Sequence, residues 1–80
     1  LMTIDYRSGR FDVVTADAQQ APIGLIDHDT FIRARQGSQP MFRLDGDEVY
    51  SLAGALLGFA DDDGLVLDAK GRRLFLIRIK

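Results

Sequence analysis

Turn signals recur along the whole chain at short intervals, and they limit what it can fold into more than any other feature. Glycine stands beside a polar or small residue at six places: Ser8-Gly9, Gly37-Ser38, Asp45-Gly46, Ala53-Gly54, Asp63-Gly64 and Lys70-Gly71. The runs between these turns are apolar or alternating and about five residues long, too short for helices and typical of β-strands. The pattern predicts an all-β meander of antiparallel hairpins.

The expected strands follow from the same punctuation. Pro22 and Pro40 each fall at the start of a run, where the N–H that proline lacks is not needed. A helix over residues 51–60 is disfavoured by two internal glycines, Gly54 and Gly58. The predicted strands are Met2–Arg7, Arg10–Thr15, Pro22–Ile26, Thr30–Arg35, Pro40–Leu44, Glu48–Leu52, Leu56–Ala60, Leu65–Asp68 and Arg73–Ile79.

Four of these apolar runs resemble one another, which indicates an internal repeat. Their second residues are spaced 18, 16 and 17 positions apart, and each run follows another predicted strand. The repeating unit is therefore a hairpin, present four times in a single domain, at about residues 9–27, 28–45, 46–61 and 62–79. The four second residues are Gly24, Phe42, Gly58 and Phe75.

These four positions alternate between glycine and phenylalanine. On one interpretation they converge on a shared axis, where two rings facing two glycines fill a small core at normal packing density. On the other, the glycines mark bulges or bends in a barrel wall and the phenylalanines pack nearby. The alternation favours the first interpretation, a closed, pseudo-fourfold meander or barrel-like arrangement.

The repeat carries a family resemblance. Its clearest copies are Leu65–Gly71 with Leu74–Ile77, and Val49–Gly54 with Leu57–Phe59, whereas residues 16–20 replace the compact glycine turn in the first repeat. Over roughly residues 10 to 79 this pattern resembles the 4-fold β-flower domain, a family of small bacterial proteins. The resemblance implies four hairpins around an axis and no catalytic residues. More weakly, Leu67–Arg72 resembles the strand and turn of PRC-barrel domains, which serve as protein- or RNA-associated modules.

Composition excludes several classes of protein. The 80 residues include no cysteine and one histidine, so disulfides and thiolate metal sites are absent. A domain this small buries only about 60% of its unfolded surface, so association with another chain is an expected source of stability. The net charge of -2 makes nucleic acid an unexpected partner. The apolar runs are too short to cross a membrane and no secretory leader is seen, so we expect a cytoplasmic protein.

The charged residues are unevenly placed among the turns. In an up-and-down meander, turns between repeats lie at one end and turns within repeats at the other. The turns within repeats carry Arg35, Lys70, Arg72 and Arg73 against Asp17. We therefore expect one basic rim and one acidic rim. The acidic rim comprises Asp27, Asp29, Asp45, Asp47, Glu48, Asp61, Asp62 and Asp63.

The acidic rim raises the possibility of a hard cation such as calcium, which takes six to eight oxygen ligands. Solvated turns are the favoured interpretation, because aspartate is a preferred turn residue for backbone reasons alone. A serine triad would need His28 together with Ser8, Ser38 or Ser51. Because His28 stands in a turn between two aspartates, we interpret it as a surface residue. We expect no catalysis, no cofactor and no metal.

Outward-facing positions supply the candidate interaction site. Arg43 stands where the other repeats have Leu25, Phe59 and Leu76, which indicates a partly exposed face. If that face is exposed, its apolar side chains form a patch suited to a protein partner. The first strands are predicted to contribute Phe11, Phe31, Val49 and Leu65 to the core.

Together these features predict a non-catalytic binding or assembly module. It docks a protein partner or forms a homodimer through a free sheet edge, either Met2–Arg7 or Leu74–Lys80. The alternative is an ion- or small-anion-binding domain that uses a charged rim.

Overall fold

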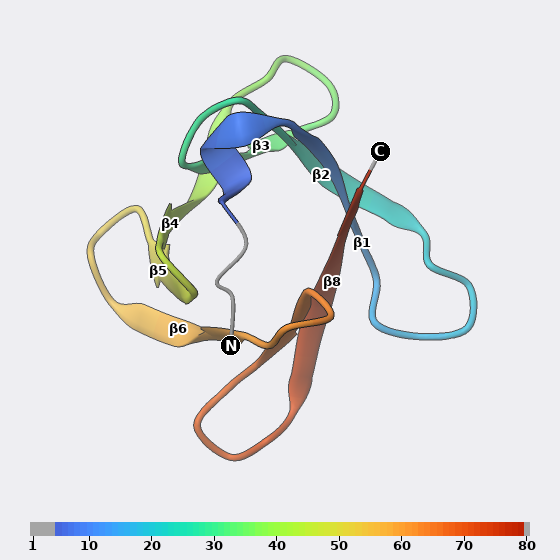
Figure 1. Cartoon of the computed structure of the whole chain (residues 1–80), viewed down its shortest axis with the longest axis vertical. Helices are drawn as coiled ribbons and strands as arrows, with labels where there is room; N and C mark the ends of the chain where they lie inside the picture. The colour runs from blue at the N-terminus through green and yellow to red at the C-terminus, as the bar shows by residue number, and fades with distance from the viewer. Residues whose placement is uncertain (1–4, 80) are drawn as a thin grey trace.

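The computed structural model describes residues 5–79, and it confirms the all-β hairpin meander. Each strand pairs antiparallel with the next along the chain, and β8 pairs with β1, so the sheet closes into a barrel (Figure 1). No helix in this part of the chain is long and apolar enough to cross a membrane. The strands are β1 (Arg10–Val14), β2 (Pro22–Asp27), β3 (Phe31–Ala34), β4 (Pro40–Asp45), β5 (Glu48–Ser51), β6 (Leu56–Ala60), β7 (Leu65–Leu67) and β8 (Arg73–Ile79).

The strand predicted at Met2–Arg7 is wrong over the residues that the structure describes, and residues 2–4 lie outside them. Tyr6–Ser8 forms a 3-10 turn, η1, and the Asp5 carboxylate accepts a hydrogen bond from the Arg7 backbone N–H at 3.1 Å. Tyr6 is buried there and packs edge-to-face on Phe11, with ring centroids 5.1 Å apart. Burying this ring at the end of the barrel favours the turn over a strand.

Closure of the sheet overturns the expectation of a free sheet edge. Along residues 5–79 every strand has a hydrogen-bonded neighbour on each side, and β8 is paired with both β7 and β1. A strand whose two edges are paired offers no row of unpaired N–H and C=O groups to another chain. The prediction of a free edge at residues 74–80 is therefore wrong over residues 74–79, and residue 80 lies outside the described part of the chain. The homodimer itself stays a prediction.

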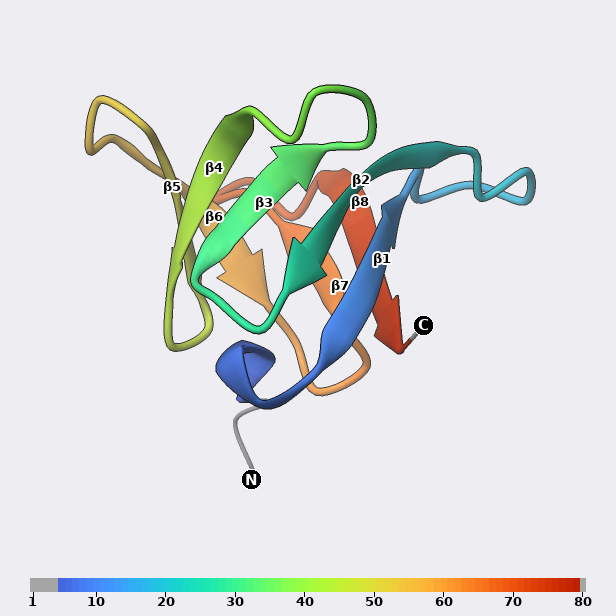
Figure 2. The ribbon, with the colours of Figure 1, turned by 90° about the horizontal axis from the view of Figure 1, so that it is seen from above.

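Each hairpin contains a β-bulge at the same place. In the first, Val13 pairs with Gly24 and Val14 pairs with Pro22, so Ile23 is left without a partner. The same shift occurs in the other three hairpins. Bulges bend a strand and increase its twist, and the tips of the hairpins splay outward beyond them (Figure 2). The four bulge residues are Ile23, Met41, Leu57 and Leu74.

Two layers of apolar side chains fill the barrel, each with one residue from every hairpin. One layer is fully buried and comes from the first strands: Val13, Ile32, Val49 and Val66, each at 0% exposure. The second comes from the other strands: Ile26, Leu44, Ala60 and Ile77. Of the first-strand residues predicted for the core, Phe11 and Val49 are buried, whereas Phe31 and Leu65 face outward and are only half-buried. Compared with the observed layer, the predicted alignment is two residues early at Phe11 and one residue early at Phe31 and Leu65.

The alternation of glycine and phenylalanine fits the first interpretation in part, because the two rings meet in the interior. The glycines do not mark the bulges, which lie one residue earlier and occur in all four hairpins. The Phe42 and Phe75 rings, from the opposed strands β4 and β8, stack with centroids 5.6 Å apart. A Cβ on Gly58 would lie 2.3 Å from the Leu67 carbonyl oxygen, and one on Gly24 would lie 2.5 Å from that of Arg33. The rings therefore meet across the interior, while the glycines let the next strand approach closely.

A shared motif forms several of the turns. The side-chain oxygen of its first residue accepts backbone N–H bonds further along the turn, as in Asp68 with Lys70 and Arg72, both at 2.9 Å. Its fourth residue has a positive φ, which suits glycine: +94° at Gly54, +87° at Gly64 and +78° at Gly71. The first hairpin has Gln20 at this position instead, with φ +47°. This explains why its turn departs from the repeat.

Candidate functional site

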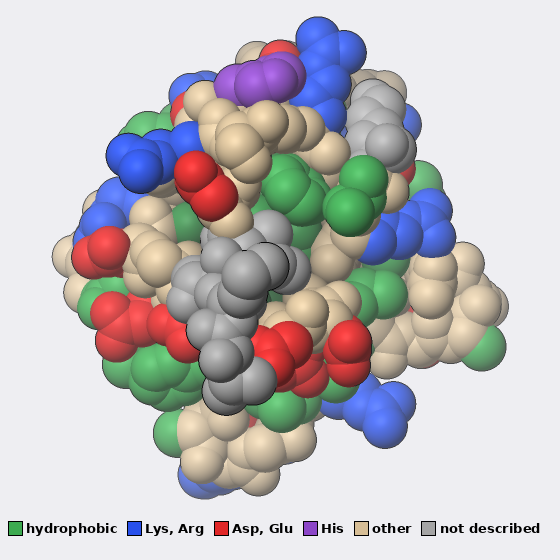
Figure 3. All heavy atoms as spheres, viewed as in Figure 1, with side chains coloured by type: hydrophobic (Ala, Val, Ile, Leu, Met, Phe, Trp, Pro, Cys, Tyr) green, Lys and Arg blue, Asp and Glu red, His purple; other side chains and the backbone are tan. Residues whose placement is uncertain are grey.

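The two ends of the barrel differ in charge. The turns between repeats and η1 lie at one end, where acidic side chains gather around the mouth of the barrel (Figure 3). Several of these carboxylates have local partners: Asp27 pairs with Arg10 at 3.2 Å, and Asp29 pairs with Arg33 at 3.0 Å. Within residues 5–79, no group of three or more His, Asp or Glu side chains is arranged to hold a metal ion.

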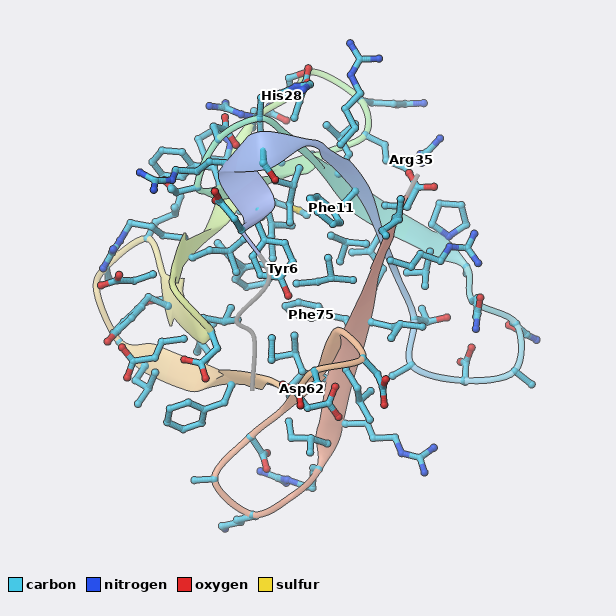
Figure 4. The ribbon with its side chains drawn as sticks, in the orientation of Figure 1. Tyr6, Phe11, His28, Arg35, Asp62 and Phe75 are labelled. Carbon is cyan, nitrogen blue, oxygen red and sulfur yellow. The ribbon has the colours of Figure 1, made fainter. Side chains whose placement is uncertain are left out.

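Tyr6 occupies the interior at the acidic end (Figure 4). Burial raises the pKa of its hydroxyl to about 12, and the nearby carboxylates of Asp61 and Asp47 act in the same direction. A group with this pKa stays neutral across the physiological range. Tyr6 is therefore a neutral, packed side chain at this end, and it borders a cavity of about 360 Å³ whose lining includes the charged residues Asp5, Arg7 and Asp45.

The opposite end carries an apolar pocket, which we call the apolar cup. Its lining consists of the stacked Phe42 and Phe75 rings, the bulge residues Leu57 and Leu74, and Asp68 at the edge. The cavity has a volume of about 420 Å³. Leu74 remains 36% exposed and Phe42 and Leu57 are half-buried, so the cup is open to a partner. Mouths of β-barrels are common binding sites.

The rim around the cup is less basic than the sequence predicts. Asp68, expected at the end of a strand, begins the β7–β8 turn instead. It accepts hydrogen bonds from two backbone N–H groups and from Arg72 Nε, the last at 2.8 Å. These bonds lower its pKa, with the Arg72 backbone N–H contributing most. Lys70, at the tip of the same turn, has no ion-pair partner among the described residues.

The predicted interaction residues do not come together. Leu25, Arg43, Phe59 and Leu76 lie on β2, β4, β6 and β8, with another strand between each pair of neighbours. Phe59 is 44% exposed, and the other three are partly buried. Arg43 extends over the Tyr50 ring, with its guanidinium carbon 4.8 Å from the ring centroid. The four positions surround the barrel wall and do not form one continuous patch.

His28 lies at the periphery, away from the interior (Figure 4). Its Nδ1 is 2.8 Å from Asp27 Oδ1, and its backbone φ is +57°. The candidate serine hydroxyls act elsewhere: Ser8 Oγ donates to the Asp5 carbonyl, and Ser51 Oγ accepts from the Ala55 N–H. No hydrogen bond joins His28 to a serine within residues 5–79.

The comparisons with known proteins add no relative to this picture. No family model, no curated protein and no solved structure matches the chain. The geometry of its two ends is therefore the basis for a functional assignment.

Sequence reasoning missed Leu57 and Leu74 as candidate binding residues. A signal was present, because the residue before each Gly or Phe of the repeat is always apolar: Ile23, Met41, Leu57 and Leu74. Strict alternation would turn these side chains away from the core. The bulges change that direction and bring two of them to the apolar cup.

Proposed function

We propose that this protein is a non-catalytic binding module that docks a protein partner at the apolar cup. One observation carries the proposal: the cavity at the end opposite Tyr6 is lined almost entirely by apolar side chains, including two stacked phenylalanine rings. Anchors that fill apolar pockets supply most of the energy of many interfaces. The outward residues Leu25, Arg43, Phe59 and Leu76 then serve as separate, secondary contacts.

The finer family assignment belongs to this proposal. A place among the 4-fold β-flower proteins is supported by the alternation of Gly24, Phe42, Gly58 and Phe75 and by the four equivalent bulges. A cytoplasmic location is supported by the lack of cysteine.

Self-association remains the second candidate, and exposed apolar side chains favour it. Leu52 is 56% exposed, and Ile79 at the end of β8 is 83% exposed. Sedimentation velocity over a hundredfold range of concentration tests it. A constant monomer mass would contradict self-association without affecting the docking of another protein.

Methyl NMR with a small apolar probe tests the cup directly. We expect benzyl alcohol to shift the methyl signals of Leu57 and Leu74 along a saturable curve, because its ring has the size of an anchoring side chain. The methyls of Leu52 and Ile79 provide the control, since both are exposed and neither lines the cup. Equal, non-saturating shifts at all four leucine and isoleucine residues would contradict the proposal.

A further inference from the structure

The shape of the apolar cup favours a side chain on a partner chain over a free small molecule. Its lining is confined to five residues, and one of them, Leu74, is itself 36% exposed. Sites for small molecules usually bury most of the ligand's surface. A shallow pocket that covers one face of its occupant is better suited to a single apolar anchor whose backbone continues outside.

The charge beside the cup favours an acidic occupant. Asp68 is the only carboxylate among the residues that line it, and two backbone N–H groups and the Arg72 guanidinium already bond to that carboxylate. Lys70 and Arg72 project from the same turn, and both are exposed. On the other side of the cup, the β5–β6 turn at residues 52–55 carries no charge. The net local charge is therefore positive, and complementary charge directs partner choice.

A second copy of the chain fits this end less well. At the acidic end the most exposed large apolar side chain among the described residues is Ile79, and it is held in the barrel wall because β8 pairs with β1 at Phe11. A residue fixed in the wall is less suited to enter the cup than one on a free, extended segment. Two cups placed face to face would bring the Lys70 and Arg72 side chains of both copies together, and like charges repel.

We infer that the apolar cup binds an acidic linear segment of another protein, with one large apolar side chain of that segment anchored against Phe42 and Phe75. Carboxylates flanking the anchor face Lys70 and Arg72. This inference rests on the proposed function, because it names the class of partner for the same site. The inference goes beyond the proposed function because it requires negative charge on the partner as well as an apolar anchor.

Fluorescence anisotropy with three labelled peptides tests the inference. The first peptide carries one Phe among Glu, Gly and Ser residues, the second replaces Phe with Ser, and the third replaces Glu with Lys. We expect only the first to bind, and its affinity to fall as salt is raised. On the protein, Leu74→Ser should weaken binding about tenfold, and Lys70→Glu about fivefold.

Matched variants separate these effects from a general loss of structure. Ile79→Ser removes an exposed apolar side chain outside the cup, and Arg7→Glu reverses an exposed charge at the acidic end. Both should keep the peptide affinity within about twofold of the parent. Because Lys70 is an exposed turn residue, Lys70→Glu keeps the test valid even if Leu74→Ser fails to fold.

Three results would overturn the inference. If the Lys peptide binds as well as the Glu peptide, the cup takes apolar anchors without regard to charge, and the proposed function stands. If Leu74→Ser abolishes a concentration-dependent dimer, the occupant is a second copy. If no peptide binds, the benzyl alcohol titration decides the rest: shifts at Leu57 and Leu74 leave the binding module in place, and their absence removes both proposals.

Discussion

At the scale of single residues, two glycines and one tyrosine explain how eight short strands share so small an interior. At Gly24 and Gly58 the neighbouring strand comes so near that its carbonyl oxygen would lie 2.5 Å and 2.3 Å from an added Cβ. Tyr6 is buried in the interior at the acidic end, where its ring packs on Phe11. Replacing any of these three residues therefore requires a shift in the packing of the surrounding barrel.

The glycine requirement gives the first prediction. Gly58→Ala should lower the free energy of unfolding by more than about 2 kcal/mol, because the new Cβ meets backbone of β7 that cannot move aside. Gly9→Ala is the matched control. Its Cβ would lie at an ordinary 3.8 Å from the Phe11 ring, and its φ of -165° suits any residue. Urea denaturation of both variants measures the difference, and equal stabilities would contradict the close approach of β6 and β7.

Tyr6 gives a prediction about alkaline pH. Its pKa is raised to about 12 in the folded protein, against an ordinary value of 10.0, so the folded state holds this proton more tightly. The stability that it contributes is complete below pH 10 and is lost as pH rises toward 12. Urea denaturation between about pH 8 and 11.5 should show a steeper loss for the parent protein than for Tyr6→Phe. Parallel pH profiles would mean that the hydroxyl is solvated.

At the scale of elements, the hairpin turns hold register through side-chain acceptors. Asp68 accepts three hydrogen bonds, and its pKa is lowered by them. Asp68→Ala should therefore lower the melting temperature at neutral pH, whereas Asp62→Ala, a control without side-chain hydrogen bonds in the described residues, should not. Because the folded pKa lies below the usual value, the effect should fade as pH falls through it. An effect of Asp68→Ala that persists at about pH 2 would contradict this origin.

The elements also show what the sequence can and cannot predict. Turns such as Asp61 to Gly64 are local, because one side chain and one positive φ specify them, and the sequence predicts them together with the strands they join. The bulge at Leu74 depends on how β7 pairs with β8, and no local signal fixes that register. The turn at Tyr6 depends on closure of the whole barrel. Its own alternating sequence predicts a strand, and that prediction is wrong.

At the scale of the whole molecule, closure of the sheet decides which surfaces are left for function. A closed barrel has no sheet edge to offer along residues 5–79, so binding must use its ends or its wall. The cavity at the acidic end has the charged residues Asp5, Arg7 and Asp45 in its lining. The wall residues Leu25, Arg43, Phe59 and Leu76 are spread around the barrel. The apolar cup remains as a concave, mostly apolar surface, and its place at the end opposite Tyr6 follows from the outward bend of the four hairpins.

Both the fold and the apolar cup depend on four hairpins meeting around one interior, and NOE spectroscopy tests that most directly. We predict cross-peaks between the ring protons of Phe42 and Phe75, and between backbone protons of β1 and β8 at the pair Val13 and Ile77. The ring cross-peaks would show that the two phenylalanines lining the apolar cup are in contact. The cross-peaks between β1 and β8 would show that the barrel is closed. An open sheet would contradict this architecture: it would show neither set, while keeping the cross-peaks within each hairpin.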